Sequence, residues 1–376
     1  MFDQSVHDKI KRKNKIFAVS AIALAVIFVT LRIILTYYFI DPDFHFYIDT
    51  AGMLEMAGDY ILAACVVIIY ITSVFAYKYK KDGEKYGEVS DCFVQGTQSQ
   101  VFSASLAGFL FVLGAFFWSY AFIRPGDAFA DLKGLPAPER VFAFITQYPF
   151  DFAILIASVL SAVYFFKTAA LNFDIGEDKD AMENKNKNKN KTEKRGRYEN
   201  TEDIEYIESI EDTEEHERAE EPKEPDGPAY KFSSAHIIFS FMPVIWAFLN
   251  VFRRFFDMSK SVNSPVMVYE LVAFLVLAAY FVSESRMLVE RRETSKFFTF
   301  AYIAVIAASA SALPNLIWSS FWIFRTNSDQ IVYAVEISIV IYILSRIYSQ
   351  IRYGRFLLQR EPGEEPEETK TTETAE

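Results

Sequence analysis

Long runs of apolar residues alternate with polar segments along the chain. Eight such runs lie at about residues 16–40, 59–77, 101–123, 149–170, 234–252, 265–283, 297–323 and 329–346. An α-helix rises about 1.5 Å per residue, so about 20 residues cross a hydrocarbon core of about 30 Å. Backbone groups in lipid must bond one another, and a helix does this within a single segment. The pattern therefore predicts an all-α fold, an eight-helix transmembrane bundle.

The charge lies mainly between and after these runs. Apolar residues make up 52% of the 376 residues, yet the net charge is −11. Residues 174–226 hold 20 acidic and 10 basic residues, and the tail after Arg360 holds seven acidic and one basic, which leaves the rest at +5. Dense charge with few apolar residues opposes folding, so both acidic segments are predicted to be disordered. The predicted divisions are a first four-helix membrane half (1–173), a disordered acidic linker (174–228), a second four-helix half (229–358) and a disordered acidic tail (359–376).

Basic residues in the short loops predict the orientation. With the N-terminus placed inside, 17 Lys and Arg fall on the cytoplasmic side and seven on the outer side. Cytoplasmic loops of membrane proteins carry an excess of Lys and Arg. We therefore expect a plasma-membrane protein with both termini and the acidic linker in the cytoplasm.

The two halves share weak similarities that suggest a duplication. Trp118-Ser119 near the end of the third run matches Trp318-Ser319 near the end of the seventh. Asp151 precedes a tyrosine by 13 residues, as Asp329 does in the last run. Four helices per half would give two parallel repeats related by an axis along the membrane normal. The alternative is chance, because aromatic residues and arginines are common at membrane interfaces.

Two local patterns predict how the helices pack and bend. Ala304, Ala308 and Ala312 recur every four residues, a spacing of small residues that lets helices approach closely. Pro243 lies inside the fifth run and Pro314 inside the seventh, where proline is expected to kink a helix.

Three charged residues within the runs form the candidate site. Arg32, Glu270 and Glu336 each lie several residues inside a run, on the side predicted to face outward. A charge inside a bilayer is costly and usually has a partner or water. One interpretation is an outward-facing polar pocket in which Arg32 faces Glu336 or Glu270. The other is that Arg32 extends to the surface and the acids cap helix N-termini, where the helix dipole favours them.

Motifs of catalysis and cofactor binding are absent from the sequence. The four histidines have no partner at metal-ligand spacing, and there is no HExxH, GxSxG, Walker glycine loop or EF-hand loop. We therefore expect no enzymatic activity, no cofactor, no metal site and no nucleic-acid partner.

Two segments carry a resemblance to known sequences. Residues 38–47, Tyr-Phe-Ile-Asp-Pro-Asp-Phe-His-Phe-Tyr, follow the first run, and residues 281–286, Phe-Val-Ser-Glu-Ser-Arg, close the sixth. This layout resembles uncharacterised multi-pass membrane proteins of anaerobic Gram-positive bacteria. The resemblance implies a bacterial plasma membrane and carries over no activity.

Two functional classes remain open. A carrier-like protein would bind a small solute or lipid headgroup in the outward pocket. A non-enzymatic sensor or scaffold would instead use the acidic linker and tail to bind cytoplasmic protein partners. Within the linker, Ile204, Ile207 and Ile210 recur every three residues and would line one face of a short docking helix, or else belong to a solvated linker. Membrane lipids are the other expected partners, and the sequence makes no prediction of oligomeric state.

Overall fold

The computed structural model describes residues 4–39, 53–77, 80–81, 84–87, 96–123, 131–199, 233–256, 265–290, 294–321, 327–353 and 357–358. Its longer helices are α1 (Gln4–Phe39), α2 (Met53–Tyr77), α3 (Gln98–Ile123), α5 (Pro149–Glu199), α7 (Met242–Phe256), α8 (Pro265–Glu290), α9 (Thr294–Phe321) and α10 (Asn327–Tyr353). The shorter elements are α4 (Ala137–Gln147), α6 (Ser234–Ser240) and the strands β1 (Lys80–Lys81), β2 (Glu84–Gly87) and β3 (Leu357–Leu358).

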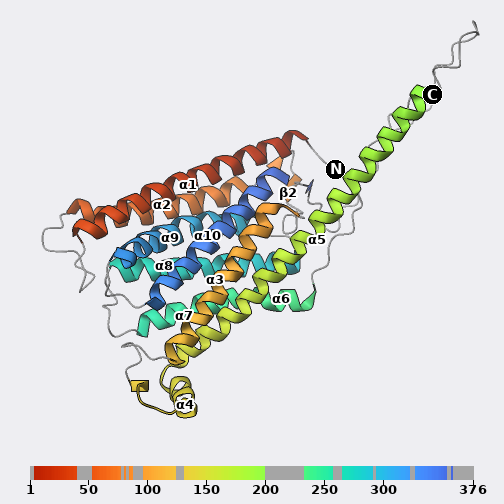
Figure 1. Cartoon of the computed structure of the whole chain (residues 1–376). Coiled ribbons are helices and arrows are strands. Elements are labelled where there is room, and N and C mark those ends of the chain that lie inside the picture. The colour runs from red at the N-terminus through yellow and green to blue at the C-terminus, as the bar shows by residue number, and fades with distance from the viewer. Residues whose placement is uncertain are drawn as a thin grey trace, which may run out of the picture.

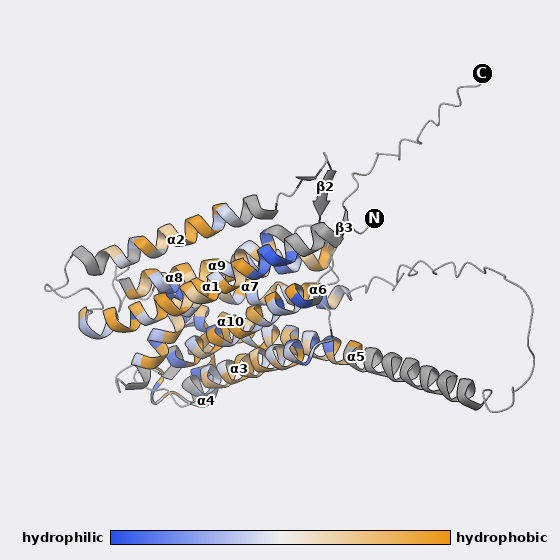
Figure 2. Ribbon diagram, turned by 90° about the horizontal axis from the view of Figure 1, so that it is seen from above, coloured by the Kyte–Doolittle hydropathy of each residue, from blue (hydrophilic) through white to orange (hydrophobic). Residues whose placement is uncertain are grey.

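The chain is a multi-pass membrane protein. Within the described residues, seven helical segments are long and apolar enough to cross a membrane. They correspond to seven of the eight predicted runs, and the remaining run corresponds to α2, whose shorter apolar stretch is Ala63–Thr72. Figure 2 shows apolar residues along most of the length of the bundle.

The helices form a closed ring of neighbours around a crowded interior. Going round it, α3 packs on α5, α5 on α7, α7 on α8, α8 on α9, α9 on α10, and α10 returns to α3. α1 and α2 lie outside this ring and pack on α9 (Figure 1). α9 is accordingly the most enclosed span, with 89% of its apolar window buried.

Small residues allow the helices to come close together. Ala304, Ala308 and Ala312 on α9 are all fully buried, as their spacing predicted. A Cβ atom at Gly108 on α3 would lie 3.1 Å from the ring of Phe166 on α5, so glycine is what permits this contact. Large aromatic residues fill the remaining interior, where Trp246 lies edge-on to Phe111 with ring centres 5.0 Å apart.

The fifth span is broken where Pro243 was expected to kink it. α6 ends at Ser240 and α7 begins at Met242, with Phe241 between them. Proline has no N–H to donate, and its ring clashes with the carbonyl four residues earlier. The helix therefore restarts, and α6 and α7 together form one candidate span, Ser234–Phe256.

The two ends of the bundle can be recognised from specific contacts. At one end Lys11 Nζ, near the start of α1, donates to the carbonyl of Arg352, near the end of α10, at 3.3 Å. We call this the predicted cytoplasmic end. At the opposite end, the predicted outer end, Arg253 Nε lies 2.9 Å from Asp151 Oδ1. This ion pair joins the end of α7 to the start of α5. The sequence predicts that these two helix ends lie on the same side of the membrane, and the contact agrees with that prediction.

Part of the acidic linker is helical in the structure, where we had predicted disorder. α5 continues from its membrane span to Glu199 and projects from the bundle (Figure 1). Extending an existing helix avoids the cost of nucleating a new one, and Lys and Glu are good helix formers. The rest of the linker, residues 200–228, and the tail beyond Leu358 lie outside the described residues.

Some smaller elements were not predicted. α4 lies between α3 and α5, and buries Phe144. The strands β1, β2 and β3 form a small antiparallel sheet that joins the segment after α2 to the segment after α10.

The two halves occupy different positions in the bundle. α1 and α2 pack on the outside of α9, whereas α7 and α8 belong to the ring. The proposed duplication stays a prediction: spans one to four should superpose on spans five to eight with Trp118 over Trp318 and Asp151 over Asp329.

Candidate functional site

A cluster of charged side chains lies inside the bundle towards its predicted outer end. Arg254 comes from the last turn of α7, Glu270 from the second turn of α8, and Glu336 from the third turn of α10. Each is at most 1% exposed. The helix dipole favours a cation in a last turn, so the end of α7 suits the charge of Arg254.

Glu270 is the best-bonded member of the cluster. Its Oε2 lies 3.2 Å from Nε of Arg254. Its Oε1 accepts hydrogen bonds from Tyr333 Oη and, at 3.2 Å, from Asn315 Nδ2. Four helices, α7, α8, α9 and α10, therefore meet at this carboxylate. One interpretation of the sequence had Arg32 facing Glu336 or Glu270, but the ion partner of Glu270 is Arg254.

Arg32 on α1 contacts α8, the helix that carries Glu270. Its side chain is 1% exposed, so it is turned into the bundle and does not extend to the surface. The guanidinium lies 3.9 Å from the ring centre of Tyr269, the residue before Glu270 on α8, in a cation–π contact. Nε and Nη1 of Arg32 are buried without a hydrogen-bond partner among the described residues.

Glu336 is the least satisfied member. Neither of its carboxylate oxygens has a hydrogen-bond partner among the described residues, and its side chain is fully buried. Glu270 and Arg254 lie within electrostatic reach of it. Asn250, one helical turn before Arg254 on α7, likewise has a buried Oδ1 with no partner among the described residues.

The structure buries all three predicted residues and brings Glu336 within electrostatic reach of Glu270, but it does not pair either acid with Arg32. Arg32, Glu270 and Glu336 all lie in the bundle interior, at 1%, 0% and 0% exposure. Among the described residues neither acid forms an ion pair with Arg32. The outward-open pocket of the first interpretation is not seen among the described residues, since Arg32, Glu270 and Glu336 are closed off from the surface.

A second buried polar cluster lies nearer the predicted cytoplasmic end. Glu284 Oε1 accepts a hydrogen bond of 2.6 Å from Tyr342 Oη, and Arg346 Nη2 lies 3.5 Å from the same carboxylate oxygen. Arg346 also donates to Tyr342 Oη from both Nε and Nη2, at 2.9 and 2.7 Å. Each charge here has an opposite charge and a hydroxyl beside it. Such a paired network is suited to holding α8 and α10 together.

The sequence had assigned the residues of this second cluster differently. By sequence position, Glu284 comes just after the sixth predicted run and Arg346 closes the eighth, where charges usually lie at the membrane surface. Both are in fact buried, at 0% and 3% exposure. Helical spacing was the missed signal: Leu277, Tyr280 and Glu284 follow one another at intervals of three and four residues and share the buried face of α8.

Comparisons with known proteins give no further assignment. No family model, no curated protein and no solved structure matches the chain. Within the described residues, no group of three or more His, Cys, Asp or Glu side chains could hold a metal ion.

Proposed function

We propose that this protein is a carrier-like membrane protein and that the Arg32–Arg254–Glu270–Glu336 cluster is its solute-binding centre in a closed conformation. The observation that carries the proposal is Glu336, a fully buried carboxylate whose two oxygens lack hydrogen-bond partners among the described residues. Buried polar groups are nearly always bonded, and an unpaired one calls for a missing water, ion or ligand. Ionisable residues inside a membrane bundle commonly mark such binding sites.

The charges of the cluster indicate the class of solute. Arg254 and Glu270 form an ion pair 3.2 Å apart and largely neutralise each other. Arg32, a cation, and Glu336, an anion, each have buried side-chain atoms with no hydrogen-bond partner in the described part of the chain. A small zwitterion, such as an amino acid, would place its carboxylate on Arg32 and its ammonium group on Glu336. Its net charge of zero would also leave the charge balance of the bundle unchanged.

A binding experiment tests this proposal. The Tm of the purified protein is measured in the presence of a zwitterion, which is L-alanine, L-glutamine or glycine betaine. Succinate, which carries only negative charge, and choline, which carries only positive charge, are the controls. A ligand at about 100 times its Kd stabilises the folded state by about 2.7 kcal/mol, so a zwitterion should raise Tm by several degrees. Glu336→Gln should abolish the rise. Glu139→Gln changes an exposed acid on α4 and should leave it intact.

The opposite result would show that the cluster is structural. If no zwitterion raises Tm, or if Glu336→Gln responds as the wild type does, the solute assignment is wrong.

The scaffold alternative rests on one specific observation. α5 extends from its membrane span, Pro149–Ile175, to Glu199, which carries a charged helix beyond the bundle. Such a helix would present the acidic linker to a cytoplasmic protein partner. Loss of a co-purifying protein after deletion of residues 176–228, with unchanged zwitterion binding, would favour this function.

A further inference from the structure

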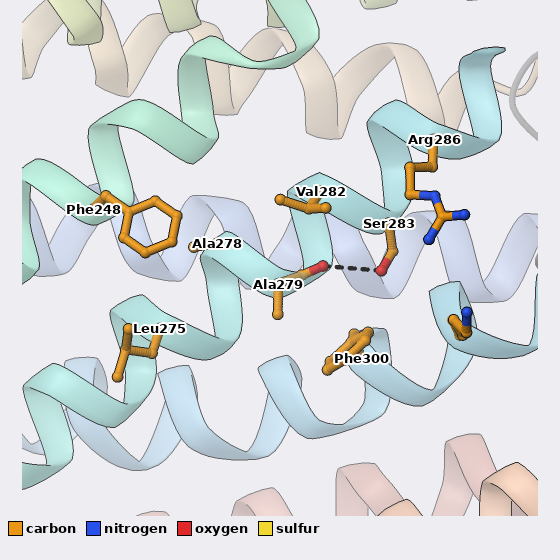
Figure 3. Close-up of a pocket in the computed structure, with 9 residues that line it drawn as sticks. Phe248, Leu275, Ala278, Ala279, Val282, Ser283, Arg286 and Phe300 are labelled. Atoms are coloured by element: carbon orange, nitrogen blue, oxygen red, sulfur yellow. Dashed lines mark hydrogen bonds between the residues drawn. The ribbon is translucent and has the colours of Figure 1, made fainter.

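A groove on the outside of the bundle has an apolar length and a basic end. Helices α7, α8 and α9 line it, and it encloses about 260 Å³ (Figure 3). That is slightly below the roughly 300–1,000 Å³ of typical small-molecule pockets. Its lining residues are Phe248, Leu275, Ala278, Ala279, Val282, Ser283, Arg286, Lys296 and Phe300.

Most of the groove is suited to hydrocarbon. Phe248, Leu275 and Val282 are 42%, 46% and 37% exposed, so they form walls that are open to the surroundings of the bundle. Ala278 and Ala279 form a shallow floor between them. The one hydroxyl, that of Ser283, donates to the carbonyl of Ala279 at 2.9 Å and so needs no polar ligand (Figure 3).

The charged end is formed by two helices. Arg286 lies near the end of α8 and Lys296 near the start of α9, and both side chains are exposed. Nearby contacts place this region at the predicted cytoplasmic end, since Tyr302 Oη on α9 donates to the carbonyl of Asn14 on α1 at 3.3 Å. Arg and Lys together suit a phosphate group, which arginine can bind through two parallel hydrogen bonds.

The dimensions agree with one leaflet of a bilayer. Leu275 and Arg286 are 11 residues apart on α8, which is about 16 Å at about 1.5 Å per residue. Half of a hydrocarbon core of about 30 Å is about 15 Å. A lipid whose phosphate meets Arg286 and Lys296 would therefore lay an acyl chain along the full length of the groove.

We propose that this groove binds one anionic phospholipid, with its phosphate on Arg286 and Lys296 and one acyl chain over Ala278 and Ala279. The charge of the two basic residues selects an anionic headgroup over a zwitterionic one. The cytoplasmic leaflet, where this end is predicted to lie, is the leaflet that carries a negative surface potential. This inference is independent of the solute-binding cluster.

Lipid retention by the full-length protein tests the proposal. Protein purified in mild detergent is titrated with phosphatidylglycerol or with phosphatidylcholine of identical acyl chains, and bound lipid is counted by native mass spectrometry. The wild type should bind one phosphatidylglycerol selectively. Each basic residue near an anionic lipid is worth about fivefold in affinity, so Arg286→Gln with Lys296→Gln should weaken phosphatidylglycerol binding on the order of 30-fold. Phosphatidylcholine binding should not change.

Two further variants separate the groove from general surface charge. Ala279→Trp leaves both charges in place but fills the floor, and should reduce retention of both lipids. Arg12→Gln with Lys15→Gln removes two exposed basic residues of α1 at the same end and should leave selectivity intact. If the wild type retains the two lipids equally, or if the α1 pair lowers selectivity as much as the groove pair, the proposal is overturned. Should the groove pair fail to fold, unchanged lipid retention by Ala279→Trp would overturn it as well.

Discussion

Replacing Glu270 with glutamine leaves Arg254 inside the bundle without its ion partner. Glutamine keeps the size of the side chain and an oxygen that can still accept from Tyr333 and Asn315, so the change removes mainly the charge. Arg254 and Glu270 have side-chain exposures of 1% and 0%, and so have little access to water. Breaking a buried pair typically costs about 3–5 kcal/mol, and a lone arginine at mid-membrane costs about 2.5–3.5 kcal/mol on insertion scales. We therefore expect Glu270→Gln to lower the free energy of unfolding by about 3 kcal/mol.

A double-mutant cycle isolates the interaction. Arg254→Met should also cost about 3 kcal/mol, because it strands the carboxylate. The double variant leaves neither member of this pair without the other, so its loss should be smaller than the sum by about 1–3 kcal/mol. The free energies are measured by reversible denaturant titration of the protein held in bicelles.

The neighbouring ion pair is the matched control. Arg253 Nε lies closer to its partner Asp151, at 2.9 Å, but the side-chain exposures of this pair are 20% and 14%. Because this pair is only partly buried, water screens it more, and its coupling should be smaller than that of Arg254 and Glu270. If both cycles give equal couplings, burial is not what makes the Arg254–Glu270 pair strong and the reasoning fails.

Three other predictions concern the rest of the molecule. Tyr342→Phe removes the hydroxyl that joins Glu284 to Arg346 and should lower the free energy of unfolding by about 2–3 kcal/mol. Tyr348→Phe is the control, because the exposed Tyr348 hydroxyl accepts only from Arg352 among the described residues. It should cost less than about 1 kcal/mol in the same titration. A reporter fused near residue 200 should register as cytoplasmic in a protease-accessibility assay, and an extracellular signal would reverse the proposed orientation. Deleting residues 176–228 should leave the membrane yield of folded protein unchanged, because no apolar run lies in this segment, and a collapse of that yield would show that it supports the bundle.

The spans were predictable because each apolar run is an independent and strong signal. A run of about 20 apolar residues has few alternatives to a membrane helix, so its identity does not depend on its neighbours. The sequence placed Arg32, Glu270 and Glu336 several residues inside a run, and all three are buried. The extension of α5 to Glu199 was missed because composition alone does not show that an existing helix can continue into a charged segment.

Side-chain pairing depended on information that lies between helices. Arg253 and Arg254 are adjacent in sequence and follow the fifth predicted run directly. The two arginines differ in the face of α7 on which they lie. Arg254 shares the buried face with Trp246 and Asn250, which precede it at intervals of four residues. Arg253 points elsewhere and lies over the ring of Trp118 at 4.5 Å. A search for charged residues in register with a buried face would have found Arg254, and also Glu284 on α8.

Solute counterflow tests the proposed carrier function most directly. Liposomes containing the protein are loaded with unlabelled L-alanine, L-glutamine or glycine betaine and diluted into the same radiolabelled zwitterion. The account predicts transient accumulation of label by the wild type and none by Glu336→Gln, although both proteins are folded and equally incorporated. Label that accumulates equally with the variant, or no accumulation above protein-free liposomes for any of the zwitterions, would contradict it.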